Sequence, residues 1–459
     1  MTARSDLVDE ELILRMAKPG PRYTSYPTAP EWSDEFGEAD ARAALQRASV
    51  RTEEPLSLYV HLPFCERRCL FCGCTVEITR NYDRVERYLD ALDVEIGRVA
   101  ELLGERRGVL QLHLGGGTPT HLDPGQLRRL YGMIASRFEV ADDAEVSIEV
   151  HPHVTTHEQI DTLAELGFNR VSMGVQDLDE RVQEVVHRFQ TTAETEDLVA
   201  HCRTRGIGGI NLDLMYGLPE QTEATFSKTI DTIARMRPDR LAVYAYAHVP
   251  WLKKTQTVLE QYAMPDPALR ARLFSRGIDQ LAEVGYEVIG LDHFALPSDS
   301  LHQALGNGTL HRNFMGYTTY PAAEMVSFGM SAIGDAGGSF LQNARTTKEW
   351  HELVEGGGLA TVRGMRRSAE DDLRREVIQS LMCRMHLDLD EIESRFGPVD
   401  FTKEWRELEP LAEEGLCTIS ERRVEVLPRG RIFLRHLAMV FDAYLTKKRA
   451  DGPRFSQTL

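Results

Sequence analysis

Four of the seven cysteines fall within ten consecutive positions, at Cys65, Cys69, Cys72 and Cys74. In a chain of 459 residues, such crowding indicates metal or redox chemistry rather than a disulfide framework. Structural zinc sites usually pair two C-x2-C knuckles separated by ~15–20 residues, whereas three closely spaced thiolates suit the wider iron–sulfur cluster. The spacing therefore favours an iron–sulfur cluster with one iron left open, and zinc is the alternative. The remaining cysteines are predicted to be buried apolar residues: Cys202, Cys383 and Cys417.

The elements that must position these cysteines alternate between short β-rich runs and amphipathic helical stretches. Strands are predicted at residues 56–64, 109–116, 145–150, 170–176, 209–218, 240–248 and 286–294. Helices are predicted at residues 85–103, from Asp123 and Pro124 onward, and at 156–166, 193–204, 223–236 and 267–284. This alternation predicts an α/β fold with parallel strands joined by right-handed crossovers. Six or more such units favour a full or partial barrel, and a doubly wound sheet is the alternative.

Polar or glycine-rich residues lie at the ends of six successive predicted strands, where parallel α/β barrels carry their active sites. They are the cysteine segment, GGGTPT after the second strand, Glu149, Gln176, Asp213 and His248. The glycines at 115–117 lack side chains, so the backbone there can approach a ligand closely. Glu149 can pair with an ammonium group or a ribose hydroxyl, and a structural salt bridge to a neighbouring helix is the alternative.

The charge balance excludes one class of function. The chain has 71 acidic and 53 basic residues, a formal net charge of −18, so general binding of nucleic acid is not expected. There is no apolar run of ~18 residues that could span a membrane. The first residues mix acids with aliphatics and lack the basic and apolar regions of a signal peptide. A cytoplasmic location is therefore predicted.

Several motifs, in order along the chain, carry a resemblance to a known family. The C-x3-C-x2-C spacing with Phe71 before the third cysteine resembles the radical S-adenosylmethionine (SAM) signature. The flanking segments PRYTSYPTAP, SLYVHLPFC, FCGC, HLGGGTPT, SMGVQD, NLDLMYGLPEQT, DHFALP, HRNFMGYTT, GRIFLRHLAMVFDAYL and RFSQTL resemble the oxygen-independent coproporphyrinogen III oxidase family. The resemblance covers nearly the whole chain and implies a partial (β/α)6 TIM-type radical SAM barrel.

The resemblance also implies roles for individual residues. Cys65, Cys69 and Cys72 would ligate a 4Fe–4S cluster whose fourth iron binds SAM, and Cys74 would be a fourth, functional cysteine that is not a ligand. A small buried thiol is the alternative for Cys74. The first SAM would be contacted by Tyr59, Gly116, Glu149 and Ile333. A second SAM would be contacted by Phe71, Gly117, Thr118, Gln176, Arg188, Asp213 and Ala247. Ordinary ion pairs are the alternative for Arg188 and Asp213.

The reaction implied is the anaerobic oxidative decarboxylation of two propionates of coproporphyrinogen III to vinyls, which gives protoporphyrinogen IX in haem biosynthesis. A 5′-deoxyadenosyl radical from SAM would abstract the propionate β-hydrogen, which is too inert for a side-chain base. The electron donor and acceptor are not identified, and the family resemblance implies a monomer. The propionates need cationic partners, for which arginine forks are well suited. We infer candidates in the N-terminal arm and in HRNFMGYTT: Arg22, Tyr23, His311 and Arg312. Packing of a loop is the alternative for Arg312.

Rival functions are a related haem-binding chaperone, a radical SAM methyltransferase or ring-opening enzyme, and a zinc adaptor. The fourth cysteine and the YTSYPT segment favour the oxidase over the chaperone. One departure concerns the family pattern Glu-Val-Asp-Pro, which here reads Glu149-Val150-His151-Pro152 and is followed by His153. These histidines could resemble a metal site, but a change of charge at the barrel mouth is favoured, with added positive charge below pH ~6.5.

The chain is predicted to divide into four regions. Residues 1–55 form an N-terminal arm in which prolines and tyrosines block regular structure. Residues 56–294 form the catalytic barrel, and residues 295–367 form a barrel extension with substrate loops. Residues 368–459 form a mainly helical C-terminal domain with one short strand pair near 417–427, and this domain is expected to close over the barrel mouth as a lid.

Overall fold

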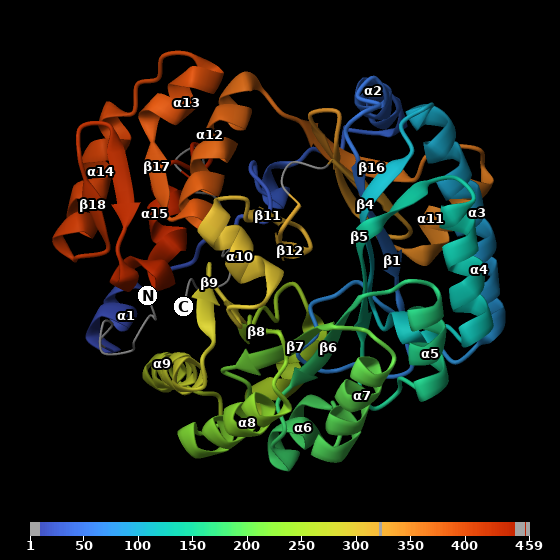
Figure 1. Ribbon diagram of the computed structural model, residues 1–459, viewed down its shortest axis with the longest axis horizontal. Coiled ribbons are helices and arrows are strands. Elements are labelled where there is room, and N and C mark those ends of the chain that lie inside the picture. The colour runs from blue at the N-terminus through green and yellow to red at the C-terminus, as the bar shows by residue number, and fades with distance from the viewer. Residues whose placement is uncertain (1–9, 321–323, 446–454, 456–459) are drawn as a thin grey trace.

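Six parallel strands in chain order form the centre of the computed structural model, which describes residues 10–320, 324–445 and 455. They are β1 (Leu56–Leu62), β4 (Gly108–Gly116), β5 (Glu139–Val150), β6 (Arg170–Gln176), β7 (Gly209–Tyr216) and β8 (Arg240–Ala245). Figure 1 shows these strands on the inside and the helices on the outside. The predicted partial (β/α)6 barrel is confirmed.

The outer helices connect successive strands and bury one apolar face against them. They are α3 (Tyr82–Leu103), α4 (Pro124–Ala135), α5 (His157–Glu165), α6 (Glu180–Val186), α7 (Thr192–Thr204), α8 (Glu223–Met236) and α9 (Pro267–Glu283). The predicted start of α4 is confirmed, since the Asp123 side chain accepts a hydrogen bond from the Gln126 N–H at 2.8 Å. These caps and apolar stripes fix where each crossover begins, and so where each strand ends.

The prediction of a single parallel strand at residues 286–294 is wrong. The segment forms β9 (Glu287–Ile289) and β10 (His293–Ala295), which pair antiparallel with each other, and β10 runs antiparallel to β8. Gly290 makes the reversal with φ +63°, a conformation that favours glycine.

At its other edge the sheet is extended by four strands. The strand β13 (Met325–Phe328) runs parallel to β1, and β14 (Ile333–Ala336), β15 (Ser339–Asn343) and β16 (Thr361–Arg366) follow in antiparallel order. Three further short elements precede β13: α10 (Ser300–Asn307), β11 (His311–Asn313) and β12 (Gly316–Thr318). The helix α11 (Thr347–Glu355) packs against α3.

The N-terminal region contains two helices that the sequence analysis did not predict, α1 (Glu10–Met16) and α2 (Glu38–Ser49). The helix α2 packs against α3 through small residues, and the buried guanidinium of Arg106 holds its C-terminal end by donating to the Ala48 carbonyl at 2.9 Å. The segment 17–37 between the two helices, here called the arm segment, runs between the barrel and the C-terminal elements.

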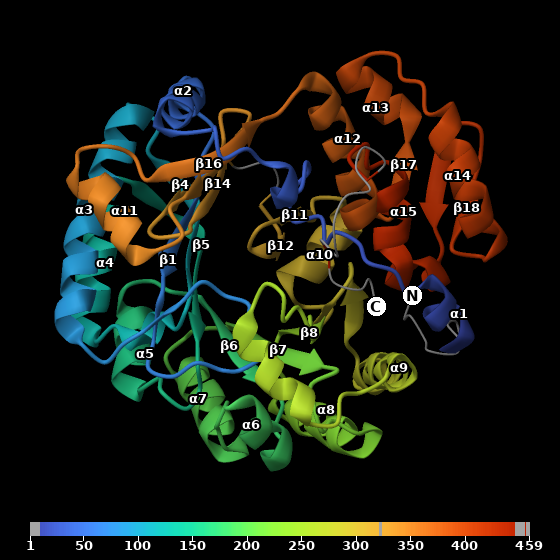
Figure 2. The same cartoon turned by 180° about the vertical axis from the view of Figure 1, so that it is seen from behind.

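The C-terminal region has its own apolar core and lies to one side of the barrel (Figures 1 and 2). Its helical elements are α12 (Ala369–Gln379), η5 (Ser380–Arg384), α13 (Leu389–Phe396), α14 (Thr402–Glu413) and α15 (Leu434–Val440). The predicted strand pair is present as β18 (Cys417–Ile419) and β19 (Arg423–Val426). The helical run α12–η5 ends at Arg384, and β17 (His386–Asp388) joins this pair as a third strand.

Contacts from the C-terminal region hold the arm segment in place. The Arg435 guanidinium donates to the Pro21 carbonyl at 2.8 Å, and the Tyr23 hydroxyl donates to Asp442 at 3.0 Å. On the barrel side, the Trp32 ring stacks on Phe340 of β15 with centroids 5.1 Å apart. The arm segment is therefore part of the joint between barrel and C-terminal region.

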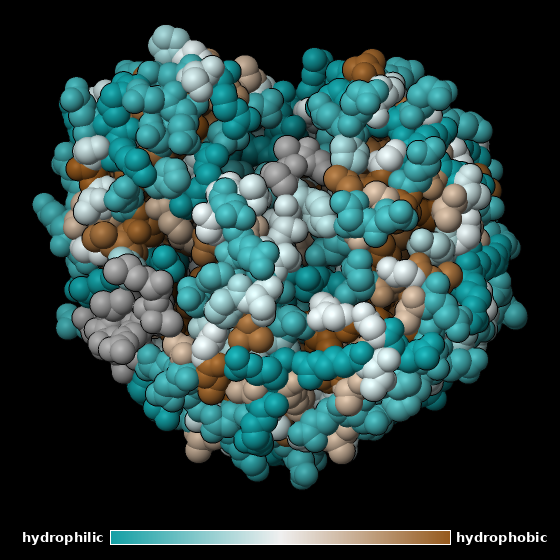
Figure 3. All heavy atoms as spheres, in the orientation of Figure 1, coloured by the Kyte–Doolittle hydropathy of each residue, from teal (hydrophilic) through white to brown (hydrophobic). Residues whose placement is uncertain are grey.

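Two further sequence predictions concern membrane-spanning segments and the isolated cysteines. Within the described ranges, no helix is long and apolar enough to cross a membrane. The face shown in Figure 3 is mostly hydrophilic, in keeping with the charge-rich composition. The three isolated cysteines are buried as predicted, at 0–2% exposure: Cys202, Cys383 and Cys417. The RFSQTL segment lies outside the described residues except for Phe455.

Candidate active site

A cavity of about 660 Å³ opens at the carboxyl ends of the parallel strands. One side is formed by residues 65–76, here called the cysteine loop, which lies between the short paired strands β2 (Phe64–Cys65) and β3 (Glu77–Ile78). The Leu70 N–H donates to the Val186 carbonyl at 2.9 Å, so the loop is also fixed to the end of α6. The ends of β4, β5, β6 and β7 supply the opposite side of this cysteine cavity.

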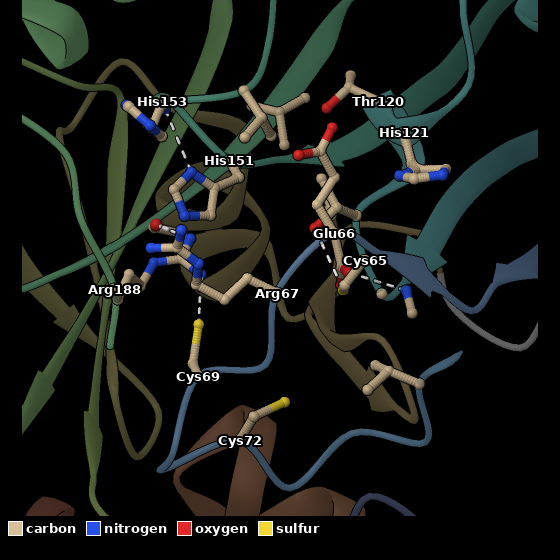
Figure 4. A pocket seen from close by; sticks show the side chains of 18 of the residues that line it. Cys65, Glu66, Arg67, Cys69, Cys72, Thr120, His121, His151, His153 and Arg188 are labelled. Atoms are coloured by element: carbon tan, nitrogen blue, oxygen red, sulfur yellow. Dashed lines mark hydrogen bonds between the residues drawn. The ribbon is translucent and has the colours of Figure 1, made fainter. Parts of the chain in front are cut away.

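All four clustered cysteines line the cysteine cavity as free thiols. The Cys65 sulfur hydrogen-bonds the Thr118 hydroxyl at 3.5 Å, and the Arg188 guanidinium donates to the Cys69 sulfur at 3.6 Å (Figure 4). The Cys74 N–H donates to the Cys72 sulfur at 3.4 Å, although the Cys74 side chain itself is exposed. The buried-thiol alternative for Cys74 therefore does not hold.

The donor set fits an iron–sulfur cluster better than a single metal ion. Among the described residues, no three His, Cys, Asp or Glu side chains are placed to hold one ion, whereas a cluster is wider. A hydrogen bond from the Cys74 thiol, helped by nearby cations, holds the pKa of Cys72 below its ordinary value. Burial raises the pKa of Cys65 to about 11, so a metal would have to displace its proton.

The glycines at the end of β4 bring backbone rather than side chains to the cavity. Gly116 has φ +117°, and a Cβ atom added there would lie 2.7 Å from the His61 ring. A Cβ atom on Gly117 would lie 2.7 Å from the Pro63 carbonyl. Both positions therefore require glycine, and the space beside them stays open to a ligand.

Glu149, at the end of β5, offers a carboxylate to the same space. Its oxygens accept the Gly116 N–H at 3.0 Å and lie 3.6 Å from His113 Nε2, while 44% of the side chain stays exposed. Burial alone would raise the pKa of Glu149, but the interactions with His113 and the Gly116 N–H outweigh it, so the pKa lies below its ordinary value. Both partners lie on β4, and the alternative of a salt bridge to a helix is not observed.

Most of the residues predicted to contact the second SAM also line the cysteine cavity: Phe71, Gly117, Thr118, Gln176, Arg188 and Asp213. Gln176 has φ +69°, and its Oε1 atom is buried without a hydrogen-bond partner. Asp213 accepts hydrogen bonds from Asn211 at 2.7 Å and Ser172 at 3.2 Å, and burial raises its pKa to about 6. No arginine or lysine pairs with it within the described ranges, so the ion-pair alternative fails there.

Three predicted contact residues do not line the cavity. Ala247 lies behind Phe71, and the Gln256 amide joins the two by donating to both carbonyls, at 3.2 and 2.9 Å. Tyr59 stacks on His113 beneath the glycines, and its hydroxyl hydrogen-bonds His61 at 3.0 Å. Ile333 lies at the start of β14, on the antiparallel part of the sheet.

Of the histidines that depart from the family pattern, His151 does not add the expected positive charge. Burial, followed by repulsion from Arg188, holds the pKa of His151 far below its ordinary value, so this ring stays neutral at the cavity (Figure 4). His153 pairs with Glu194 at 3.0 Å and His157 with Asp197 at 2.7 Å. The two outer rings therefore face surface acids, and no metal site is formed by this group in the described part of the chain.

The predicted substrate residues lie apart from the cysteine cavity. Arg22 and Arg312 both approach Asp292, at 3.7 and 4.0 Å, and His293 hydrogen-bonds the same carboxylate at 2.8 Å. These four residues are here called the Asp292 cluster. Burial alone would raise the pKa of Asp292, but the His293 hydrogen bond and the two guanidinium groups hold it well below its ordinary value.

The other two substrate candidates have partners or surroundings of their own. The Tyr23 side chain is buried at 2% exposure with its hydroxyl bonded to Asp442. His311 on β11 has its pKa lowered to about 4, first by burial and then by Arg375. Tyr244 of β8 borders the Asp292 cluster, since its ring meets His293 and its centroid lies 5.8 Å from the Arg22 guanidinium carbon.

Five residues that the structure places at these sites were missed as functional candidates: His61, His113, Gln256, Asp292 and His293. His61 could have been found from the sequence, because it lies two positions after Tyr59 and so shares the same face of β1. Asp292 belongs to the DHFALP motif, but nothing local indicates that its partners lie about 20 and 270 residues away.

Comparisons with known proteins agree along the whole chain. A family model of the radical SAM superfamily matches residues 59–233, and a model of the HemN C-terminal domain matches residues 368–433. Proteins named oxygen-independent coproporphyrinogen III oxidase are similar throughout. The one from Salmonella typhimurium is 42% identical over 98% of both chains, and the one from Pseudomonas aeruginosa is 41% identical with the same coverage.

A solved structure gives the same result for the fold. It is described as coproporphyrinogen III oxidase from Escherichia coli, a radical SAM enzyme, and it superposes with a TM-score of 0.89 at 41% identity. The match covers 92% of this chain and 97% of the other.

Proposed function

Because this chain belongs to the oxygen-independent coproporphyrinogen III oxidase family, we propose that it converts two propionates of coproporphyrinogen III to vinyls, giving protoporphyrinogen IX without oxygen. It is a radical SAM oxidoreductase of haem biosynthesis. The observation that carries the proposal is that one cavity gathers the cysteine motif, the glycine-rich strand end and Glu149, in a chain related to these oxidases along its full length.

Three thiolates, those of Cys65, Cys69 and Cys72, would hold the 4Fe–4S cluster. With SAM bound, the cluster supplies one-electron cleavage of the sulfonium and a carbon radical able to take an inert hydrogen atom. The Arg188 guanidinium at the Cys69 sulfur offsets the negative charge that the thiolates bring to the cavity. The backbone N–H of Cys74 similarly stabilises the thiolate of Cys72.

The residues around Gly116 would hold the amino acid part of the first SAM. Glu149 is ionised at neutral pH and can accept from an ammonium group, while the glycines leave room for it to approach. Tyr59 contacts both His61 and His113, and these three side chains pack beneath the proposed binding position at Gly116. Ile333 would contribute from the neighbouring sheet edge. The set around Gln176, Arg188 and Asp213 is proposed to bind a second SAM, which the unpartnered Gln176 Oε1 supports.

Binding of the substrate propionates is proposed at the Asp292 cluster, where Arg22 and Arg312 are the cations. Because Asp292 neutralises part of their charge, a propionate would share these guanidinium groups with it or replace it. One buried nitrogen of Arg312 has no hydrogen-bond partner, which leaves a donor for an incoming carboxylate. His311 lies on β11 beside Arg312, and Tyr23 holds the adjoining arm segment to the C-terminal region.

The proposal is tested by anaerobic incubation of the reconstituted protein with coproporphyrinogen III, SAM and dithionite. We expect two equivalents of carbon dioxide and a product with two vinyls for each substrate molecule. Haem binding without vinyl product would instead support a chaperone, and a methylated product would support a methyltransferase.

A monomeric state, a cytoplasmic location, and a separate electron donor and acceptor remain predictions. The seven free cysteines are compatible with a reducing compartment. Sedimentation analysis of the reconstituted enzyme tests the monomer directly.

A further inference from the structure

An exposed apolar and basic surface lies directly outside the cysteine loop. It consists of Trp251, Leu252, Lys254 and Val258, here called the Trp251 patch. Trp251 is 50% exposed, Leu252 67% and Val258 44%, although large apolar side chains are usually covered when they adjoin one another. None of the four lines the cysteine cavity, so substrate or SAM binding there does not account for them.

The segment that carries the patch is bonded to the cysteine loop itself. The Lys253 ammonium donates to the Cys74 carbonyl at 3.3 Å, and the Gln256 amide donates to the Phe71 carbonyl at 2.9 Å. In Figure 2 the yellow-green turn of η4 (Lys254–Gln261) lies on the viewer's side of the barrel, beside the blue cysteine loop. A molecule seated on the patch is therefore one layer of residues from the cysteine loop.

The charge of this segment is opposite to that of the molecule. Residues 247–259 contain two lysines and no acidic residue, in a chain whose net charge is −18. The next acid, Glu260, is paired with His248 at 3.2 Å. A basic surface on an acidic protein attracts acidic partners selectively and speeds their encounter.

From this placement we propose that the Trp251 patch is the docking surface for an acidic one-electron carrier protein that reduces the cluster. The inference rests on the proposed function, which needs one electron delivered to the cysteine loop. The carrier loses one electron and the bound cluster gains it, and no atom is transferred. Small interfaces with a few apolar contacts and charge steering are typical of such transient redox encounters.

The test uses the reconstituted full-length enzyme and flavodoxin, an acidic flavoprotein, as the probe. Binding of oxidised flavodoxin is measured by calorimetry at two salt concentrations, and turnover is measured with reduced flavodoxin and, separately, with dithionite. We expect Lys254→Glu, and separately the double change Trp251→Ser with Leu252→Ser, to weaken flavodoxin binding about tenfold or more. Turnover with dithionite should stay within twofold, because a small reductant needs no docking surface.

Lys403→Glu is the matched control, since Lys403 is an exposed lysine on α14 of the C-terminal region. Equal iron content and thermal midpoints establish that the variants are folded. The proposal is overturned if flavodoxin does not bind the unmodified enzyme, if the patch variants bind it normally, or if Lys403→Glu weakens binding equally. A dimer that the double variant dissociates would show that a second copy covers the patch. Absence of turnover with dithionite would count against the proposed function alone, because the binding measurement is independent of it.

Discussion

The cysteine cavity and the Asp292 cluster both place charged groups inside the barrel, but the two sites differ in how far the protein's own side chains pair with those groups. In the cavity, Cys69, Gln176 and Glu149 face open space, and the Gln176 Oε1 atom has no hydrogen-bond partner. In the cluster, two guanidinium groups and an imidazole surround one carboxylate. The cavity leaves ligand-binding groups open, whereas in the cluster one carboxylate already offsets part of the charge of the two guanidinium groups.

Two aspartates make the difference measurable. Burial dominates at Asp213 and raises its pKa, while cationic neighbours dominate at Asp292 and lower its pKa. The carboxyl group of Asp213 on β7 is therefore held toward its neutral form, whereas that of Asp292, just before β10, is held toward its ionised form. The contrast teaches that burial alone does not determine the charge state of an acid in this barrel, because the arm segment brings Arg22 to only one of them.

The largest effect is expected from Cys69→Ser. Loss of one of the three proposed thiolate ligands should remove the cluster and all turnover, since a serine hydroxyl is a poor ligand for an iron–sulfur cluster. Iron and sulfide analysis with the anaerobic product assay measures both. Cys383→Ser, which changes a buried cysteine of the C-terminal region, should keep the cluster. Full turnover in Cys69→Ser would show that the cavity is not the reaction centre.

Cys74→Ser should lower the turnover while leaving most of the cluster in place. The Cys74 backbone N–H, which contacts the Cys72 sulfur, survives the substitution, so most of the cluster should remain. We expect activity to fall at least tenfold if the exposed thiol takes part in the reaction. Iron content and rate are measured on the same sample. Unchanged turnover would remove Cys74 from the proposed functional residues.

Asp292→Asn should act on stability more than on cluster content. Removing the carboxylate leaves the buried Arg312 guanidinium and the partly exposed Arg22 guanidinium unbalanced, at a cost of about 3–5 kcal/mol. The pKa of Asp292 is lowered in the folded protein, so its contribution is present above the unfolded pKa and is lost as the pH falls below it. The deficit of the variant in thermal midpoint should therefore shrink from pH 7 toward pH 3. Asp197→Asn, at an exposed pair with His157, should change little at either pH.

The smallest effect, with the opposite sign, is expected from Asp213→Asn. The folded pKa of about 6 lies above the unfolded value of 3.8, so the contribution of Asp213 is present at low pH and is lost as the pH rises through about 6. The asparagine variant should thus gain thermal midpoint relative to the unmodified protein between pH 4.5 and pH 7, by a few degrees. A gain in the reverse direction would mean that Asp213 is ionised in the folded protein.

The parts of this molecule set by local sequence were predictable. The cysteine spacing, the Asp123 cap and the glycines before Thr118 act within a few residues, and the structure places them as the sequence indicated. The helix α2 was missed because its buried positions are largely alanines, such as Ala41, Ala44 and Ala48, which form no strong apolar stripe.

Features that depend on contacts between residues far apart in the sequence could not be predicted. Arg312 lies 290 residues from Arg22, and neither local sequence contains a sign of the other. The reversal at Gly290 also looks like the interior of one strand, because both halves are apolar and short. The neutral state of His151 follows from its burial near Arg188, which only the folded barrel establishes.

The path of the arm segment has a consequence for synthesis of the protein. The carbonyl of Pro21 and the hydroxyl of Tyr23 find their partners at Arg435 and Asp442, near the end of the chain. During translation the barrel strands leave the ribosome long before those partners exist. The arm segment is therefore made early but is among the last to be fixed in place, and a nascent chain stopped short of residue 435 would leave Arg22 without the anchor beside it.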